Sequence, residues 1–154
     1  MRGKDVAREL GLYSRGLTVD AKNALGLLVA LLMVSVGLSL TLAALNLNDL
    51  EKVAGQITKV GTKAPWFLYY LLSARVVAEE VFFRGFLAKK FGILPSSLAF
   101  AFAHASYGSV SEVIGALVLG GLLAWVYKAN QNIVPNIFAH VAYNLVILKF
   151  LFWV

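Results

Sequence analysis

The feature that most constrains the fold of this chain is residues 23–48, a long stretch without a single charged side chain. A helix needs about 20 mostly apolar residues to cross the roughly 30 Å hydrocarbon core of a bilayer, and this stretch is long enough. A cleavable signal peptide is the alternative, but its apolar region covers only about 7–15 residues. The stretch therefore predicts a retained transmembrane helix.

The overall composition agrees with a membrane protein. Hydrophobic residues make up 60% of the 154 residues and charged residues only 14%, whereas a soluble domain is about half apolar and a quarter charged. Cysteine is absent, which excludes a disulfide, a thiolate metal site and a cysteine nucleophile. The net charge of +6 does not indicate nucleic-acid binding, because the basic residues gather at the ends of apolar segments.

Further apolar segments follow the first one, after a polar loop at residues 46–64. They cover residues 65–90, 91–107, 110–127 and 133–154. The predicted fold is therefore an all-α polytopic membrane bundle of about five transmembrane helices. We expect one transmembrane domain at residues 23–154, preceded by an interfacial segment at residues 1–22.

The interfacial segment combines positive charges with apolar residues at helical spacing. Val6, Leu10, Tyr13 and Leu17 recur every three or four residues, which predicts an amphipathic helix lying in the membrane surface. A cytoplasmic N-terminus puts most loop lysines and arginines on the cytoplasmic side, as is usual in membrane proteins. The chain is thus expected to be a multi-pass membrane protein with its N-terminus in the cytoplasm.

Ionisable side chains interrupt the second apolar segment. An ionised group inside the bilayer is costly, so it normally pairs with another group or faces a polar cavity. Separations of four residues predict two ion pairs, Arg75 with Glu79 and Glu80 with Arg84. Mutual neutralisation is the simpler interpretation, but two buried ion pairs gain little stability over apolar packing. A functional site is therefore favoured.

Two later segments also carry polar side chains. An antiparallel hairpin folded near residues 91–92 would bring His104 to the depth of Glu79, near the middle of the membrane. Asn136, His140 and Asn144 are spaced by four and share one helix face. Hydrogen bonding between helices is the alternative role for these three. Straight helices place His140 away from the depth of His104, so we expect a long or re-entrant connection between Ala105 and Glu112.

Two carboxylates, two imidazoles and an amide in one cavity suit hydrolysis by activated water. A buried glutamate can take a proton from water, and an imidazole can orient that water or protonate a leaving amine. The amide of Asn144 can stabilise a developing oxyanion. No serine lies beside a histidine in a recognisable nucleophile arrangement.

A metal-dependent version of this site stays open. Two histidines and one carboxylate, here Glu79, His104 and His140, form a known ligand set for catalytic zinc. The sequence contains no His-Glu-x-x-His motif to support it. The cofactor is thus either a divalent metal such as zinc or none.

Three motifs together resemble the CPBP family of intramembrane proteases, which includes CAAX prenyl endopeptidases and bacteriocin-processing, Abi-type immunity proteins. They are EExxxR starting at Glu79, FxxxH ending at His104, and HxxxN from His140 to Asn144. The resemblance covers residues 78–144. Each motif alone is weak, but their order and spacing on apolar segments are fairly specific.

The resemblance implies an all-helical membrane endopeptidase. Its implied site residues are Glu79, Glu80, Arg84, His104, His140 and Asn144. By this analogy Glu79 activates water, the histidines and Asn144 position it and stabilise the tetrahedral intermediate, and Glu80 and Arg84 have a supporting role. The implied partners are the lipid bilayer and a membrane-anchored or lipidated peptide, and the short chain indicates a minimal enzyme or a homo-oligomer.

Two other function classes remain open at this point. A non-catalytic membrane interaction or immunity protein could keep the same fold. A proton or ion pathway uses the same kinds of buried acids and imidazoles, although the chain shows no repeat of the kind many transporters contain.

Overall fold

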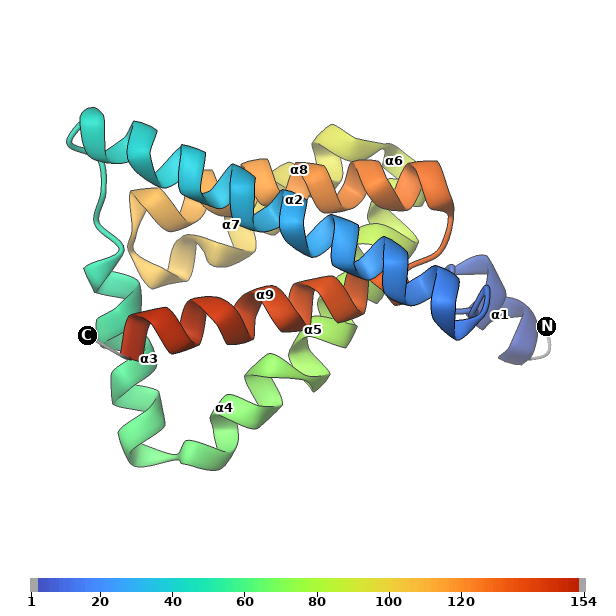
Figure 1. Cartoon of the computed structure of the whole chain (residues 1–154), viewed down its shortest axis with the longest axis horizontal. Coiled ribbons are helices and arrows are strands. Elements are labelled where there is room, and N and C mark those ends of the chain that lie inside the picture. Colours follow the sequence, from blue (N-terminus) through green and yellow to red (C-terminus); the bar gives the residue numbers. More distant parts are fainter. Residues whose placement is uncertain (1–2, 153–154) are drawn as a thin grey trace.

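The computed structural model describes residues 3–152, and every regular element in this range is a helix, as predicted (Figure 1). Two helices, α2 (Leu17–Ala44) and α8 (Val110–Asn130), are long and apolar enough to cross a membrane. The last helix, α9 (Val134–Phe152), has a shorter apolar stretch. The count of five spans therefore stays a prediction.

The N-terminal region differs from the single amphipathic helix expected at residues 1–22, of which Met1 and Arg2 lie outside the described residues. Helix α1 covers only Gly3–Glu9, and α2 already begins at Leu17. Between them, Gly11 and Gly16 have φ angles of 81° and 106°. Glycine reaches this left-handed region at little cost, so the chain turns here instead of continuing as a helix.

Buried Asp20 fixes the start of α2. Its carboxylate accepts hydrogen bonds from the Ser14 hydroxyl at 2.6 Å and from the backbone N–H of Arg15 at 3.1 Å. The Asn132 amide, in the turn between α8 and α9, donates to the other carboxylate oxygen at 3.0 Å. A negative charge in the first helical turn is also favoured by the helix dipole. The first long helix is thereby tied to the α8–α9 turn.

The expected polar loop at residues 46–64 contains a helix, α3 (Glu51–Lys63). Val53 and Ile57 are spaced by four residues and both line a cavity, whereas most of the helix is polar. This one-sided pattern is typical of a surface helix. The average hydropathy of the segment is low, which is why the sequence predicted a loop here instead of a helix.

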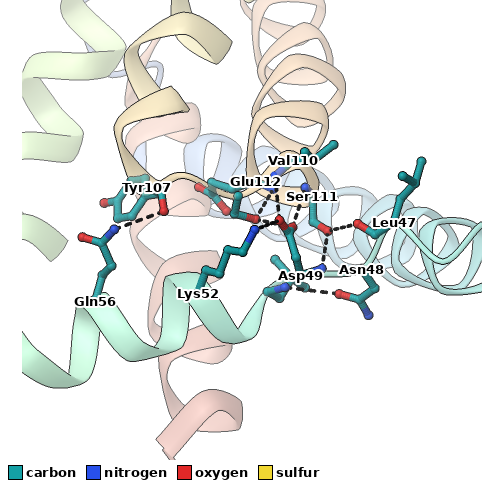
Figure 2. Close-up of polar contacts among 11 residues, drawn as sticks. Leu47, Asn48, Asp49, Lys52, Gln56, Tyr107, Val110, Ser111 and Glu112 are labelled. Carbon is teal, nitrogen blue, oxygen red and sulfur yellow. Dashed lines mark hydrogen bonds and ion pairs between the residues drawn. The ribbon is translucent and has the colours of Figure 1, made fainter.

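A polar clamp, shown in Figure 2, ties the start of α3 to the N-terminus of α8. The Asp49 carboxylate accepts hydrogen bonds from the Ser109 hydroxyl at 2.7 Å and from the N–H groups of Val110 and Ser111 at 3.1 and 3.0 Å. The Ser111 hydroxyl donates to the Leu47 carbonyl oxygen at 2.8 Å. Hydrogen bonds from the Ser111 N–H and the Ser109 hydroxyl hold the pKa of the Asp49 carboxyl well below its usual range.

The second apolar segment is a broken helix instead of the continuous one expected at residues 65–90. It consists of α4 (Pro65–Leu72), α5 (Ala74–Glu79), the π-helix η1 (Glu80–Ala88) and the short α6 (Lys89–Phe91). The break between α4 and α5 falls at Ser73. A π-helix is rare, and such wide turns are frequent at functional sites.

The last helices of the chain complete the bundle. Helix α7 (Ile93–His104) leads through a single 3₁₀ turn, η2 (Ala105–Tyr107), into α8. Gly120 lets α8 approach α7 closely, because a Cβ there would lie 2.8 Å from Cδ1 of Phe100. Helix α2 packs against α8 and α9 on another side. Ala116, Gly120 and Ala124, three small residues of α8 spaced by four, are all buried, which is typical of a face that packs against other helices.

Candidate active site

A cavity of about 190 Å³ lies among α3, α5, α7, α8 and α9. Glu79, His104, His140 and Asn144 all line it. The aliphatic part of its wall comes from Leu50, Val53, Ile57, Leu68, Ile147 and Leu148. Four of the six sequence-predicted site residues therefore share one space that can hold several water molecules.

A second cavity of about 160 Å³ extends toward α2 and shares part of this lining. His104, His140 and Asn144 border both cavities. The polar groups are thus bordered by open space on two sides, which favours a role in contact with water or a ligand over a purely packed one.

Glu80 and Arg84, the other two predicted site residues, lie behind the cavity and do not line it. Their side chains are 0% and 1% exposed, and Nη1 of Arg84 lies 3.0 Å from Oε1 of Glu80. The Arg84 guanidinium stacks over the Phe100 ring at 4.2 Å, and Nη2 donates to the Gly120 carbonyl oxygen at 3.4 Å. This contact of a cation with an aromatic face stabilises the buried charge.

Helix α9 docks onto the same buried glutamate. Nδ1 of His140 lies 2.8 Å from Oε1 of Glu80, and the Asn136 amide donates to Oε2 at 3.4 Å and to the Leu123 carbonyl oxygen at 2.8 Å. A carboxylate accepts hydrogen bonds, so Nδ1 of His140 carries the hydrogen and Nε2 is left for the cavity side. We refer to Glu80, Arg84, Asn136 and His140 as the inner network.

Glu79 belongs to a different set of contacts, on the cavity itself. Nε of Arg75 lies 2.7 Å from Oε1 of Glu79, and Nη1 donates to the Tyr107 hydroxyl at 2.8 Å. Nη2 of Arg75 lies 3.5 Å from Nε2 of His104, whose Nδ1 contacts the Phe100 carbonyl oxygen at 2.9 Å. Because a carbonyl oxygen only accepts, Nδ1 of His104 carries the hydrogen and Nε2 accepts from Arg75. Both ion pairs expected from the four-residue spacing are thus present.

The two imidazoles reach one cavity without the long connection expected between Ala105 and Glu112, because η2 is a single turn and α8 begins at Val110. The Phe100 ring lies near both, with centroids 4.4 Å from the His104 ring and 6.1 Å from the His140 ring. Because His104 and His140 both line this cavity, counting along straight helices overestimated their separation.

Three further polar residues of the cavity were not singled out from the sequence: Tyr107, Glu112 and Tyr143. Glu112 lies in the first turn of α8, where an acid is common at any helix N-terminus. No local signal therefore distinguished it from an ordinary helix start. Only the packing of α8 beside η1 and α9 brings it to the site.

The metal-dependent alternative for the site depends on Glu79, His104 and His140. Within residues 3–152, no group of three His, Cys, Asp or Glu side chains is close enough to hold a metal ion. The ligand set left open above, Glu79, His104 and His140, is not assembled, and the Arg75 guanidinium contacts both Glu79 and His104. The Arg75 guanidinium therefore contacts two of the three residues of that ligand set.

The fold and the cavity define an all-helical protein with long apolar helices and a cavity among them that carboxylate and imidazole side chains line. The chain belongs to the family described as type II CAAX prenyl endopeptidase Rce1-like, which matches residues 61–146 and so includes all six predicted site residues. Membership implies a protease, and together with the apolar helices it implies a membrane protein. No curated protein and no solved structure is significantly similar to the chain.

Proposed function

We propose that this chain is an intramembrane endopeptidase that hydrolyses peptide bonds of membrane-anchored or lipidated substrates, including prenylated CAAX-type peptides. The observation that carries the proposal is the convergence of Glu79, His104, His140 and Asn144 on one cavity. These residues come from three separate helices, α5, α7 and α9. The family match supports the same reaction class.

In the proposed reaction Glu79 acts as the general base. It takes a proton from a water molecule as the water oxygen attacks the carbonyl carbon of the scissile bond. Nε2 of His140 orients this water, because Nε2 of His104 already accepts from Arg75, and the Asn144 amide donates to the oxygen that becomes negative. The proton held by Glu79 then passes to the leaving amine when the C–N bond breaks.

The inner network supports this chemistry without taking part in it. Glu80 holds Nδ1 of His140 and the amide of Asn136, and so fixes α9 against η1. Its carboxylate oxygens are thereby engaged by protein donors, whereas a general base needs an oxygen within reach of water. We therefore assign the base role to Glu79.

A cleavage assay with purified protein tests the proposal. Prenylated CAAX peptides, the same peptides without lipid, and transmembrane peptides are each incubated with the protein in detergent or proteoliposomes, and products are identified by mass spectrometry. We expect cleavage of a lipidated or transmembrane peptide, slowed at least about 100-fold by Glu79→Gln. Equal cleavage by both proteins removes Glu79 as the base, and no cleavage of any peptide favours a non-catalytic interaction protein.

We also propose a multi-pass topology of five spans with a cytoplasmic N-terminus, the broken helix from α4 to α6 forming the second span. The chain contains no cysteine, so single cysteines can be labelled without background. A cysteine at Gln131 should then react with a membrane-impermeant thiol reagent only from the cytoplasmic side, and one at Lys59 only from the opposite side. The reverse pattern would contradict the orientation, and labelling of both from one side would contradict the span count.

A further inference from the structure

One cationic side chain of the cavity, that of Arg75, has no role in the reaction proposed above. Arg75 is the only lysine or arginine among the described residues that line the cavity. Its side chain is 29% exposed, compared with 1% for Arg84 two turns of the same broken helix away. One arginine is therefore available to a ligand in the cavity, and the other is enclosed in the inner network.

The guanidinium of Arg75 is held on three sides. Nε contacts Glu79, Nη1 donates to the Tyr107 hydroxyl and Nη2 donates to His104. A guanidinium has five N–H hydrogens in a planar fork, so about two remain for another acceptor. The group is thus preorganised beside the expected base and still has donors to offer.

We propose that Arg75 is a further catalytic residue, whose guanidinium stabilises the oxyanion of the tetrahedral intermediate; this inference rests on the proposed peptidase function. A preorganised donor aimed at a developing negative charge is often the largest single contribution to catalysis. It acts most strongly in a cavity with apolar walls, where water screens the interaction less than in bulk solvent. Six aliphatic side chains supply the apolar part of the wall here.

The charge balance of the reaction step fits this role. When Glu79 takes the proton of the attacking water, a C–O bond forms and the carbonyl π electrons move to the carbonyl oxygen. The negative charge thereby leaves Glu79 and appears on the substrate oxygen. Arg75, which pairs with Glu79 before the step, can pair with the oxyanion after it. The cavity then has the same net charge throughout, and the pair is restored when the intermediate collapses and the amine leaves with the proton.

A rival role for Arg75 is to anchor the C-terminal carboxylate of a CAAX-type substrate. In cleavage after the lipidated cysteine, that carboxylate lies three residues from the scissile bond. Three extended residues span about 10 Å, but Nε of Arg75 is 2.7 Å from Oε1 of Glu79. The guanidinium is therefore too close to the base for this role and is placed at the reacting atoms instead.

The test compares affinity for the transition state with affinity for the ground state. A phosphinic peptide carries a tetrahedral, negatively charged group that mimics the intermediate, and a peptide N-methylated at the scissile bond mimics the bound substrate. We expect Arg75→Gln to lower kcat by about 10²–10³-fold, to weaken phosphinic-peptide binding by a similar factor, and to leave KM and N-methylated-peptide binding nearly unchanged. The exposed Arg8 provides a matched control, because Arg8→Gln should leave all four quantities unchanged.

The outcomes separate this inference from the function on which it rests. If the wild-type chain cleaves no peptide, the peptidase proposal itself fails. If the wild type cleaves and Glu79→Gln does not, but Arg75→Gln retains kcat, the oxyanion role alone is overturned. Equal weakening of both ligands by Arg75→Gln also overturns it, because a residue that only positions Glu79 and His104 would not distinguish them.

Two milder variants keep the test usable if Arg75→Gln does not fold. Arg75→Lys keeps the charge and loses the planar fork, and Tyr107→Phe removes the hydroxyl that holds Nη1. In both variants kcat and phosphinic-peptide affinity should fall together, and less than in Arg75→Gln. A fall in kcat without any change in phosphinic-peptide affinity would contradict the inference.

Discussion

Glu79 and Glu80 are consecutive residues with the same side chain, yet the fold places them in different environments. The Glu80 side chain is 0% exposed and contacts Arg84 and His140 within the inner network. The Glu79 side chain is 12% exposed, lines the cavity and pairs with Arg75. The two carboxylates are thus chemically identical and differ only in their surroundings.

Helix geometry explains how neighbours in sequence come to differ so much. Consecutive residues of a helix point about 100° apart around its axis, so a cavity on one side and packed helices on the other divide the pair. Glu80 contacts Arg84 of its own helix and His140 and Asn136 of α9. These contacts specify how α9 docks against η1. A buried ion pair adds little net stability, but losing one partner is costly. The comparison therefore predicts a functional role for Glu79 and a structural role for Glu80.

Neutralising each carboxylate in turn tests the different roles of Glu79 and Glu80 directly. Glu79→Gln should lower kcat by about 10²–10⁴-fold, because the general base is lost, with little change in the melting temperature. Glu80→Gln should lower the melting temperature clearly, because the Arg84 charge is left buried without its partner. Peptide cleavage and thermal unfolding of both variants measure the two effects.

The results for Glu79→Gln and Glu80→Gln can also contradict the functional role of Glu79 and the structural role of Glu80. If Glu80→Gln abolishes cleavage while the protein keeps its melting temperature, the roles of the two residues are exchanged. Comparable loss of activity in both, with unchanged stability, would mean that the two carboxylates act as one catalytic unit.

The second prediction concerns the arginine of the inner network. Arg84→Gln leaves the Glu80 charge buried and should lower the free energy of unfolding by about 3–5 kcal/mol. Replacing both partners, as Glu80→Gln with Arg84→Met, should restore part of this loss, because no unpaired charge remains buried. Denaturant unfolding of the detergent-solubilised variants tests this. A single variant as stable as the wild type would contradict the structural role.

The third prediction uses two asparagines of one helix face. Asn144 lines the cavity, whereas Asn136 donates to Glu80 and to the Leu123 carbonyl oxygen. Asn144→Ala should remove about 1.5–3 kcal/mol of transition-state stabilisation, or roughly 10- to 150-fold in kcat, with an unchanged fold. Asn136→Ala should instead cost about 1–3 kcal/mol of stability, because buried acceptors lose their donor. Equal effects of both on kcat would contradict the division into cavity and inner network.

Local spacing predicted much of this site. The pairs of Arg75 with Glu79 and of Glu80 with Arg84 follow from four-residue separations, which one helix fixes by itself. The same periodicity placed Asn136, His140 and Asn144 on one face. What spacing could not predict is which side of the helix would face the cavity, because that depends on how η1, α7 and α9 pack together.

The fold also contains features that no local pattern indicated. The break at Ser73 and the wide turns of η1 interrupt a segment that looks like one continuous apolar helix. Helix α3 lies in a segment whose average hydropathy is low. The Asp49 clamp joins residues about sixty positions apart, and a contact between distant segments leaves no periodic signal in the sequence.

The fourth prediction concerns the Asp49 clamp. Like Glu80, Asp49 is a carboxylate that accepts hydrogen bonds from another helix, but it lies outside the apolar helices. The folded pKa of Asp49 lies below its unfolded value of about 3.9, so the carboxylate stabilises the fold above that pH and loses its contribution as the pH falls below it. Asp49→Asn should therefore lower the melting temperature by a few degrees at pH 7, and the difference should narrow below about pH 4. Lys52→Gln is the control, because its exposed pair with Asp49 contributes little. A difference that stays constant down to pH 2, or an equal effect of Lys52→Gln, would show that the carboxylate does not hold α3 to α8.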